Sequence, residues 1–137
     1  AAVCNGINAV GANLAGRNLR GSHFNKANFA GASFLNADLR GASFRGAKLS
    51  GADFSGANLT GANFSGQDLS GLLFVGAVLQ GANLSRCILG ADFTDADLSG
   101  ANLRGASGID EGDFSGAIVD DVKGLSAENR ELLEELV

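Results

Sequence analysis

Leucine or phenylalanine recurs at every fifth residue over most of the chain. From residue 14 to residue 84 this step of five is never broken, and the residues between are mainly Ala, Gly, Asn, Ser and Asp. Such a regular apolar position predicts the structural core. Its members are Leu14, Leu19, Phe24, Phe29, Phe34, Leu39, Phe44, Leu49, Phe54, Leu59, Phe64, Leu69, Phe74, Leu79 and Leu84.

A step of five suits neither one helix nor one flat strand. A helix turns about 100° per residue, so residues five apart do not form a stripe along it. In a strand the side chains alternate, so successive Leu and Phe would point to opposite faces. The pattern instead predicts a short extended segment followed by a corner. Four such sides close a coil of 20 residues, stacked roughly 4.8 Å from the next coil.

Two further positions of the repeat hold small residues. The residue two before each Leu or Phe is mostly Ala, and the residue two after it is mostly Gly. We expect Ala to point inward where the walls crowd, and Gly to supply the backbone geometry of the corners.

Units such as Gly-Ala-Asp-Phe-Ser at residues 51–55 and Gly-Ala-Asn-Leu-Thr at residues 56–60 resemble the pentapeptide-repeat family, whose pattern is A(D/N)LXX. The resemblance covers about residues 10–119. It implies an all-β fold, a right-handed quadrilateral β-helix, here of about five coils. The motif describes the wall and leaves the outward positions free, so it says little about activity.

The repeat loses its register twice. One residue is missing near residues 88–90, so Leu89 is followed by Phe93. One residue is added near Gly108, after which Ile109, Phe114 and Val119 resume the step. The wall is expected to kink or to carry a small bulge there, which is either a functional feature or an evolutionary slip.

The two ends depart from the repeat. Residues 1–10 keep the phase poorly and are interpreted as an N-terminal segment or cap, residues 11–122 as the solenoid, and residues 123–137 as a C-terminal amphipathic helix. Ser126 is the expected N-cap of this helix. Its apolar face, which would cover the open end of the solenoid, is formed by Leu132, Leu133, Leu136 and Val137.

Composition excludes several classes of protein. The chain has 21 Gly but no Pro, Met, Trp or Tyr. Gly does not recur at every third residue, which excludes collagen. Hydrophobic residues make up 45% and charged residues 18%, which argues against disorder. The chain has no Met to start it, so a processed or trimmed chain is expected.

Charge is unevenly spread along the chain. The net charge is −5, but residues 1–86 carry +4 and residues 87–137 carry −9. In an elongated rod this makes the C-terminal end acidic. The longest nearly apolar stretch, residues 71–79, is too short for a membrane span, so no membrane insertion is expected.

No residue pattern indicates catalysis, a cofactor or a metal. Cys87 takes an Ala-like inward position, which favours a packing role over a redox switch with the distant Cys4. His23 has no second His and no Cys beside it, so neither a zinc site nor a nucleophile–base pair is expected. The acids of residues 92–121 are interpreted as solvated surface rather than a calcium site.

One group of outward residues breaks the polar rule. Leu73, Val75 and Val78 lie at outward positions on two adjoining walls, where other coils carry Asn or Ser, and they are the candidate interaction residues. Ile88 lies nearby. The alternative is that the oversized inward Leu72 distorts this coil and buries some of them.

These features favour a non-enzymatic scaffold or protein-interaction module with an unidentified protein partner, no nucleic acid, and a monomeric or weakly homo-oligomeric state. The chain resembles small family members of the chloroplast thylakoid lumen, with the cyanobacterial lumen, the periplasm and the cytoplasm as alternatives. The alternative function is that of family members that mimic DNA and bind gyrase. Such a role calls for a mostly acidic rod, whereas the first four coils here are net positive.

Overall fold

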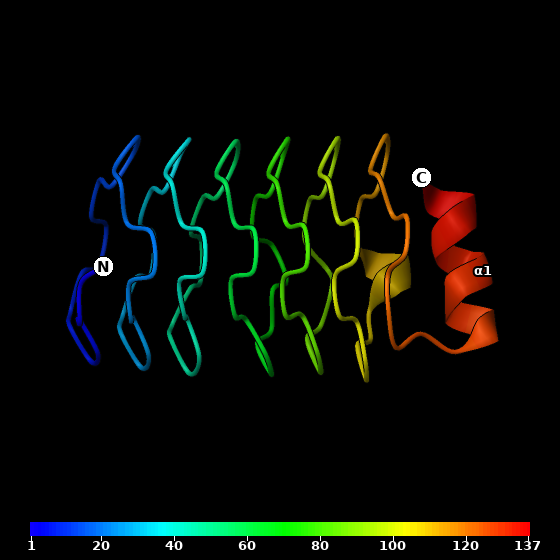
Figure 1. The fold of residues 1–137 in the computed structure, drawn as a ribbon, viewed down its shortest axis with the longest axis horizontal. Coiled ribbons are helices and arrows are strands. Elements are labelled where there is room, and N and C mark those ends of the chain that lie inside the picture. The colour runs from blue at the N-terminus through cyan, green and yellow to red at the C-terminus, as the bar shows by residue number, and fades with distance from the viewer.

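The chain winds as a stack of four-sided coils. The computed structural model describes residues 1–137, and Figure 1 shows the coils side by side with the two termini at opposite ends. Isolated parallel bridges join residues 20 apart, from Val3 with His23 to Asn63 with Asn83. The protein is therefore a right-handed quadrilateral β-helix, as the repeat predicts.

The core consists of the inward Leu and Phe side chains. All the expected core residues are buried except Leu14 and Leu19, which are half-buried in the first coil. Phenylalanines on successive coils stack face to face, with ring centroids 4.9 Å apart between Phe34 and Phe54 and 5.2 Å apart between Phe54 and Phe74. Ring stacking therefore has nearly the period of the backbone ladder.

The first ten residues have the same conformation as the rest of the wall. Val3 and Asn8 pair with residues of the second coil, and Cys4 N–H donates to His23 O over 2.8 Å. The boundary expected at residue 10 thus marks no change in the backbone, and the ladder makes six steps from Val3 to Lys123 where about five coils were expected. What changes is the filling, because Cys4 and Ala9 replace Leu or Phe.

Both register breaks fall within a continuous ladder. The bridge from Leu73 to Asp92 spans one residue fewer than the usual 20, and the bridge from Asp92 to Asp113 spans one more. The added chain forms a short 3-10 helix, η1 (Ile109–Glu111), whose Ile109 side chain is buried. The coil absorbs the insertion as a local bulge and keeps its alignment afterwards.

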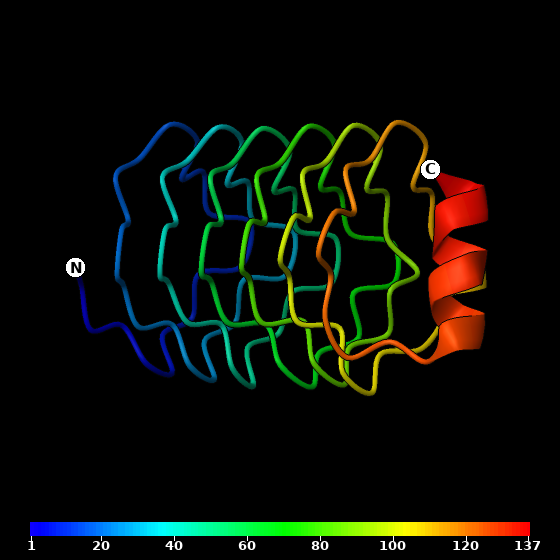
Figure 2. The ribbon, with the colours of Figure 1, turned by 45° about the vertical axis from the view of Figure 1, so that its right-hand side comes forward.

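The C-terminal helix α1 (Ala127–Leu136) stands across the end of the last coil (Figure 2). The Ser126 hydroxyl caps it by accepting from Asn129 N–H over 3.2 Å. Leu133 is buried and Leu132 and Leu136 pack against the core, whereas Val137 lies beyond the helix and is 45% exposed. The end of the chain is therefore not part of the apolar face expected for it. No helix here combines the length and apolar character of a membrane span.

The ladder opens at one place, beside Gln67. No backbone hydrogen bond joins residues 45–51 to residues 64–72, and Lys48 does not pair with Asp68. The Gln67 side chain takes an inward position where most coils have Ala, and its Nε2 donates to Phe44 O and to Ala47 O, both over 2.9 Å. Figure 1 shows the wider spacing at the lower edge, between the blue-green and the green coils. Gln67 bridges the two coils at this opening. The opening extends to Leu72, the other large inward residue of the coil, since Leu73 N–H does not donate to Ala52 O as its equivalents do.

Cys87 lies at an inward position and is fully buried. Its Sγ donates to Phe64 O over 3.0 Å, and burial raises the pKa of this thiol to about 11. Cys4, in the first coil, is half-buried, and neither cysteine forms a disulfide.

Replacing Gln67 with Ala is expected to stabilise the protein by about 1–2 kcal/mol in urea unfolding. The smaller side chain allows the two coils to approach and to form the missing backbone bonds, each contributing about 0.5–1.5 kcal/mol, which exceeds the loss of the two side-chain bonds. Hydrogen exchange of the Leu49 and Gly51 amides is expected to slow at the same time.

Gln80→Ala is the matched control, since Gln80 is exposed on another wall, and we expect a change within about 0.5 kcal/mol. A destabilised Gln67→Ala variant with Leu49 and Gly51 amides still in fast exchange would show that Gln67 bridges a gap it does not cause.

A Cys4→Ser variant is expected to leave Cys87 unreactive toward a disulfide reagent at pH 8. The raised pKa of Cys87 lowers its thiolate fraction about 100-fold relative to an ordinary thiol, and burial slows the reaction further. In urea the thiol is expected to react at the rate of a peptide cysteine. Fast labelling without denaturant would contradict the position of Cys87 in a closed core.

Candidate interaction surface

The wall that contains Leu73 carries exposed apolar side chains. We call it the Leu73 wall, and its central outward column is Asn13, Ser33, Asp53, Leu73, Asp92 and Asp113. Leu73 is 41% exposed and Val75, two residues later on the same wall, is 37% exposed. The outward position needs no apolar residue for folding, so these two side chains are available for contact.

The other candidate, Val78, lies apart from this pair. It belongs to the next wall, between Asn58 and Asp97 in the ladder, and it is half-buried. Ile88 is exposed on the wall that precedes the Leu73 wall. The structure thus places Leu73 and Val75 together and leaves Val78 as a neighbour around the corner.

Leu72 does not disturb this surface. Its side chain is 1% exposed and points into the core at the position usually occupied by Ala. Leu73 and Val75 stay exposed beside it. The alternative, that the large Leu72 side chain causes burial of its neighbours, therefore does not apply to these two residues.

The sequence reasoning missed Leu35, which belongs to the same surface. Leu35 is 40% exposed and lies at the repeat position of Val75 two coils earlier, with Ser55 between them. The sequence did indicate an outward position for Leu35, because Leu35 directly follows the inward Phe34, as Val75 follows Phe74. Ile118 was missed as well, but it lies on the wall of Val78.

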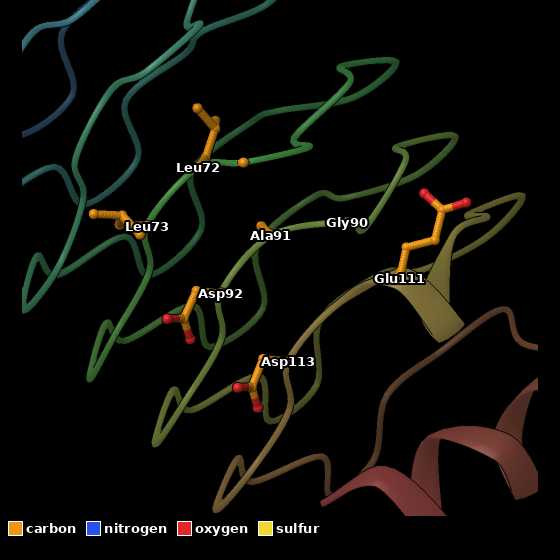
Figure 3. A pocket seen from close by; sticks show the side chains of 8 residues that line it. Leu72, Leu73, Gly90, Ala91, Asp92, Glu111 and Asp113 are labelled. Carbon is orange, nitrogen blue, oxygen red and sulfur yellow. The ribbon is translucent and has the colours of Figure 1, made fainter.

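A shallow depression of about 270 Å³ adjoins Leu73. It follows from the two register breaks, because Gly90 shortens one coil and η1 widens the next. Figure 3 shows Leu73, Asp92 and Asp113 on successive coils, with Glu111 of η1 to the right and its carboxylate directed away from the two aspartates. An apolar side chain therefore borders a concave surface that carries three carboxylates.

The carboxylates of this depression have no cationic partner. The protein has one ion pair, between Arg40 and Asp38 on another wall, at 2.6 Å. Asp92 Oδ1 accepts from the backbone and the hydroxyl of Thr94, at 3.0 and 2.6 Å. Hydrogen bonds from the backbone and side chain of Ser115 lower the pKa of Asp113. The depression is therefore anionic at neutral pH, and its charge is not neutralised within the chain.

This surface combines apolar and acidic side chains. The acids do not assemble with His or Cys into a group suited to hold a metal ion. His23 is exposed on the opposite wall, between Val3 and Ser43 in the ladder. An exposed apolar pair beside unneutralised carboxylates suits a protein segment that carries both apolar and basic side chains.

Comparison with solved structures finds pentapeptide repeat proteins. Solved structures similar to the chain include a pentapeptide repeat protein from the cyanobacterium Cyanothece 51142, at 24% identity over 88% of this chain and 86% of that one, with a TM-score of 0.44. Another comes from the Arabidopsis thaliana thylakoid lumen, at 29% identity over 98% and 75%, with a TM-score of 0.35. A third is QnrB1, a plasmid-mediated fluoroquinolone resistance protein, at 18% identity over 97% and 96%, with a TM-score of 0.38.

The comparison with curated proteins finds no relative. The family model for pentapeptide repeats, in contrast, matches in eight copies, over residues 10–46, 37–71, 47–90, 68–107 and 87–122. These ranges include every coil from the end of the first to the last, both register breaks among them. The chain belongs to the pentapeptide repeat family.

Proposed function

We propose that the protein is a non-enzymatic scaffold that binds a protein partner through the Leu73 wall. Pentapeptide repeat proteins are generally structural or interaction scaffolds. The observation that carries the proposal is the pairing of exposed Leu73 and Val75 with the anionic depression of Asp92, Glu111 and Asp113. The partner segment is expected to carry a Lys or Arg next to an aliphatic or aromatic side chain.

The filled core supports binding over catalysis. Inward positions are closed by Leu, Phe and Ala, so the axis of the solenoid holds no cleft in which a substrate would be enclosed. The walls present short polar residues, which bury little apolar area on contact. The Leu73 wall differs in combining exposed apolar area with a depression, whereas the more exposed Val3 and Val10 lie in the open first coil.

Gyrase binding by DNA mimicry fits the charge distribution poorly. The wall beside Leu73 bears Arg20 and Arg40, and residues 1–86 are net positive. A surface that imitates the even negative charge of a duplex would not carry these cations. We expect the protein not to protect gyrase from quinolones. Tight binding of the protein to gyrase at physiological salt would favour DNA mimicry over the scaffold function.

The thylakoid lumen is retained as the proposed compartment. The support is the resemblance of the sequence to small lumenal members with a short helix after the solenoid. Fractionation of the source cells with an antibody to the protein tests it, and recovery in the cytosol would refute it.

The proposed function is tested by peptide selection on the immobilised protein. From a random library we expect enrichment of segments with Lys or Arg beside an apolar residue. The double variant Leu73→Ser/Val75→Ser is expected to bind the selected peptides at least about tenfold more weakly, a loss of about 1.4 kcal/mol. Its circular dichroism should be unchanged, because Phe74 remains in place.

Ile118→Ser is the matched control, since Ile118 is equally exposed but lies on the adjoining wall. Its affinity for the same peptides is expected within about twofold of the parent protein. Enrichment of acidic peptides, or equal binding to the double variant, would place the binding surface elsewhere.

A further inference from the structure

Two arginines border a second depression, on the wall opposite the Leu73 wall. It has a volume of about 410 Å³ and is lined by Ser85, Arg86, Asn102, Arg104 and Gly105, with no apolar residue. Neither guanidinium group donates a hydrogen bond to the protein, and neither forms an ion pair. No carboxylate lines the depression.

The position of Arg86 is unusual for a corner. Its φ is 57°, in the left-handed region where most corners of this solenoid have Gly. An L-residue there costs roughly 1–2 kcal/mol relative to its ordinary conformation. The Arg86 side chain also packs closely over Gly105, where an added Cβ would lie 3.2 Å from its Cγ. Lys26 occupies the same corner three coils earlier, with φ 60°, and packs over Gly46 in the same way, so the corner accepts a long basic side chain twice.

The depression arises where the chain leaves the solenoid. Gly66 N–H donates to Ser85 O and Arg86 N–H donates to Arg104 O, both over 2.8 Å, in the regular step of this corner. The next amide in the series, Gly105 N–H, has no backbone acceptor, because the chain turns away at Gly124 toward α1. Like the other amides of this series, the Gly105 N–H points toward the C-terminal end of the solenoid, and Gly105 also lines the depression.

The remaining polar groups add donors and positive charge. Asn102 Oδ1 accepts from Arg104 N–H over 3.0 Å, so its amide nitrogen is the part free to donate to a ligand. Lys123, the ladder partner of Asn102, is exposed one coil further along. Of the three basic residues among residues 87–137, Arg104 lines the depression and Lys123 lies one coil further along, although that part of the chain is strongly acidic.

We propose that the depression at Arg86 and Arg104 binds a phosphate group. Arginine guanidinium matches phosphate and carboxylate oxygens equally well as a fork. A single guanidinium group, however, already pairs with both oxygens of a carboxylate, whereas the oxygens of a phosphate point in several directions. A phosphate can therefore engage two guanidinium groups at once, and its double negative charge matches the two arginines.

The site is independent of the Leu73 wall and of the function proposed for it. Its phosphate has two possible sources, which share the same chemistry: a free phosphate or small phosphate ester, or a phosphoserine on a protein. The comparison of inorganic phosphate with a phosphoserine peptide distinguishes them.

The experiment is a titration of the ¹⁵N-labelled protein, followed by NMR, with inorganic phosphate at pH 7.5 and constant ionic strength. We expect saturable shifts at the Gly105 amide and the Asn102 side-chain amide. Arg86→Gly restores the common corner residue and Arg104→Ser restores the residue of the two preceding coils, so both variants should fold. Each is expected to raise the dissociation constant at least about tenfold.

Arg45→Ser is the matched control, because Arg45 occupies the repeat position of Arg104 three coils earlier and is also exposed. It should leave phosphate binding unchanged. Equal losses in Arg45→Ser, shifts unaffected by Arg86→Gly and Arg104→Ser, equal shifts with chloride, or equally tight binding of acetate would each overturn the proposal.

The same titration with a phosphoserine peptide and its unphosphorylated form identifies the source. Binding of the phosphopeptide at least about tenfold more tightly than inorganic phosphate assigns the site to a phosphoprotein. Equal affinities for the two assign it to free phosphate. Tight binding of the unphosphorylated peptide would overturn the proposal, since phosphate would then not be what the site recognises.

Discussion

The backbone hydrogen bonds between successive coils set the distance to which the rest of the structure must conform. Parallel neighbours lie roughly 4.8 Å apart. Aromatic rings stack favourably at nearly the same separation, and the column from Phe34 to Phe114 keeps centroid distances of 4.9 to 5.2 Å. One spacing therefore satisfies both interactions, and this explains why the core residue can be Phe or Leu while the inward neighbour is nearly always small.

Gln67 shows how narrow this tolerance is. Ser22 and Cys87 also replace Ala, yet the ladder stays closed around both, since the one is small and the other is compact and apolar, whereas Leu72 borders the same opening as Gln67. The longer amide of Gln67 must hydrogen-bond when it is placed inside, and the acceptors within reach are carbonyl groups of the wall itself. Gln67 Nε2 is satisfied by two carbonyl groups of the preceding coil, at the point where the two coils lie apart.

The regular coil could be predicted from the sequence, but its local irregularities could not. The step of five and the small residue before it determine the four-sided coil, the core and the corners, because each repeats often enough to exclude other solutions. The ladder pairing of residues 1–10 was not foreseen, since pairing needs only backbone groups and Cys4 and Ala9 hide the apolar signal. The exposed Leu35 was visible only once its distance from Val75 was counted in coils. The exposure of Val137 depends on where α1 ends, which no periodic signal determines.

Both candidate binding surfaces lie where the repeat is interrupted, and the reason is geometric. A regular solenoid with a filled core has flat walls, and a flat wall of short side chains gives a ligand little to enclose. The depression beside Leu73 exists because one coil is a residue short and the next is longer by η1. The depression at Arg86 exists because the chain departs at Gly124 and leaves the Gly105 amide without a partner. In such a fold, concave and chemically distinct surface is generated by breaking the repeat, so the irregular coils are where recognition of a partner or ligand is to be sought.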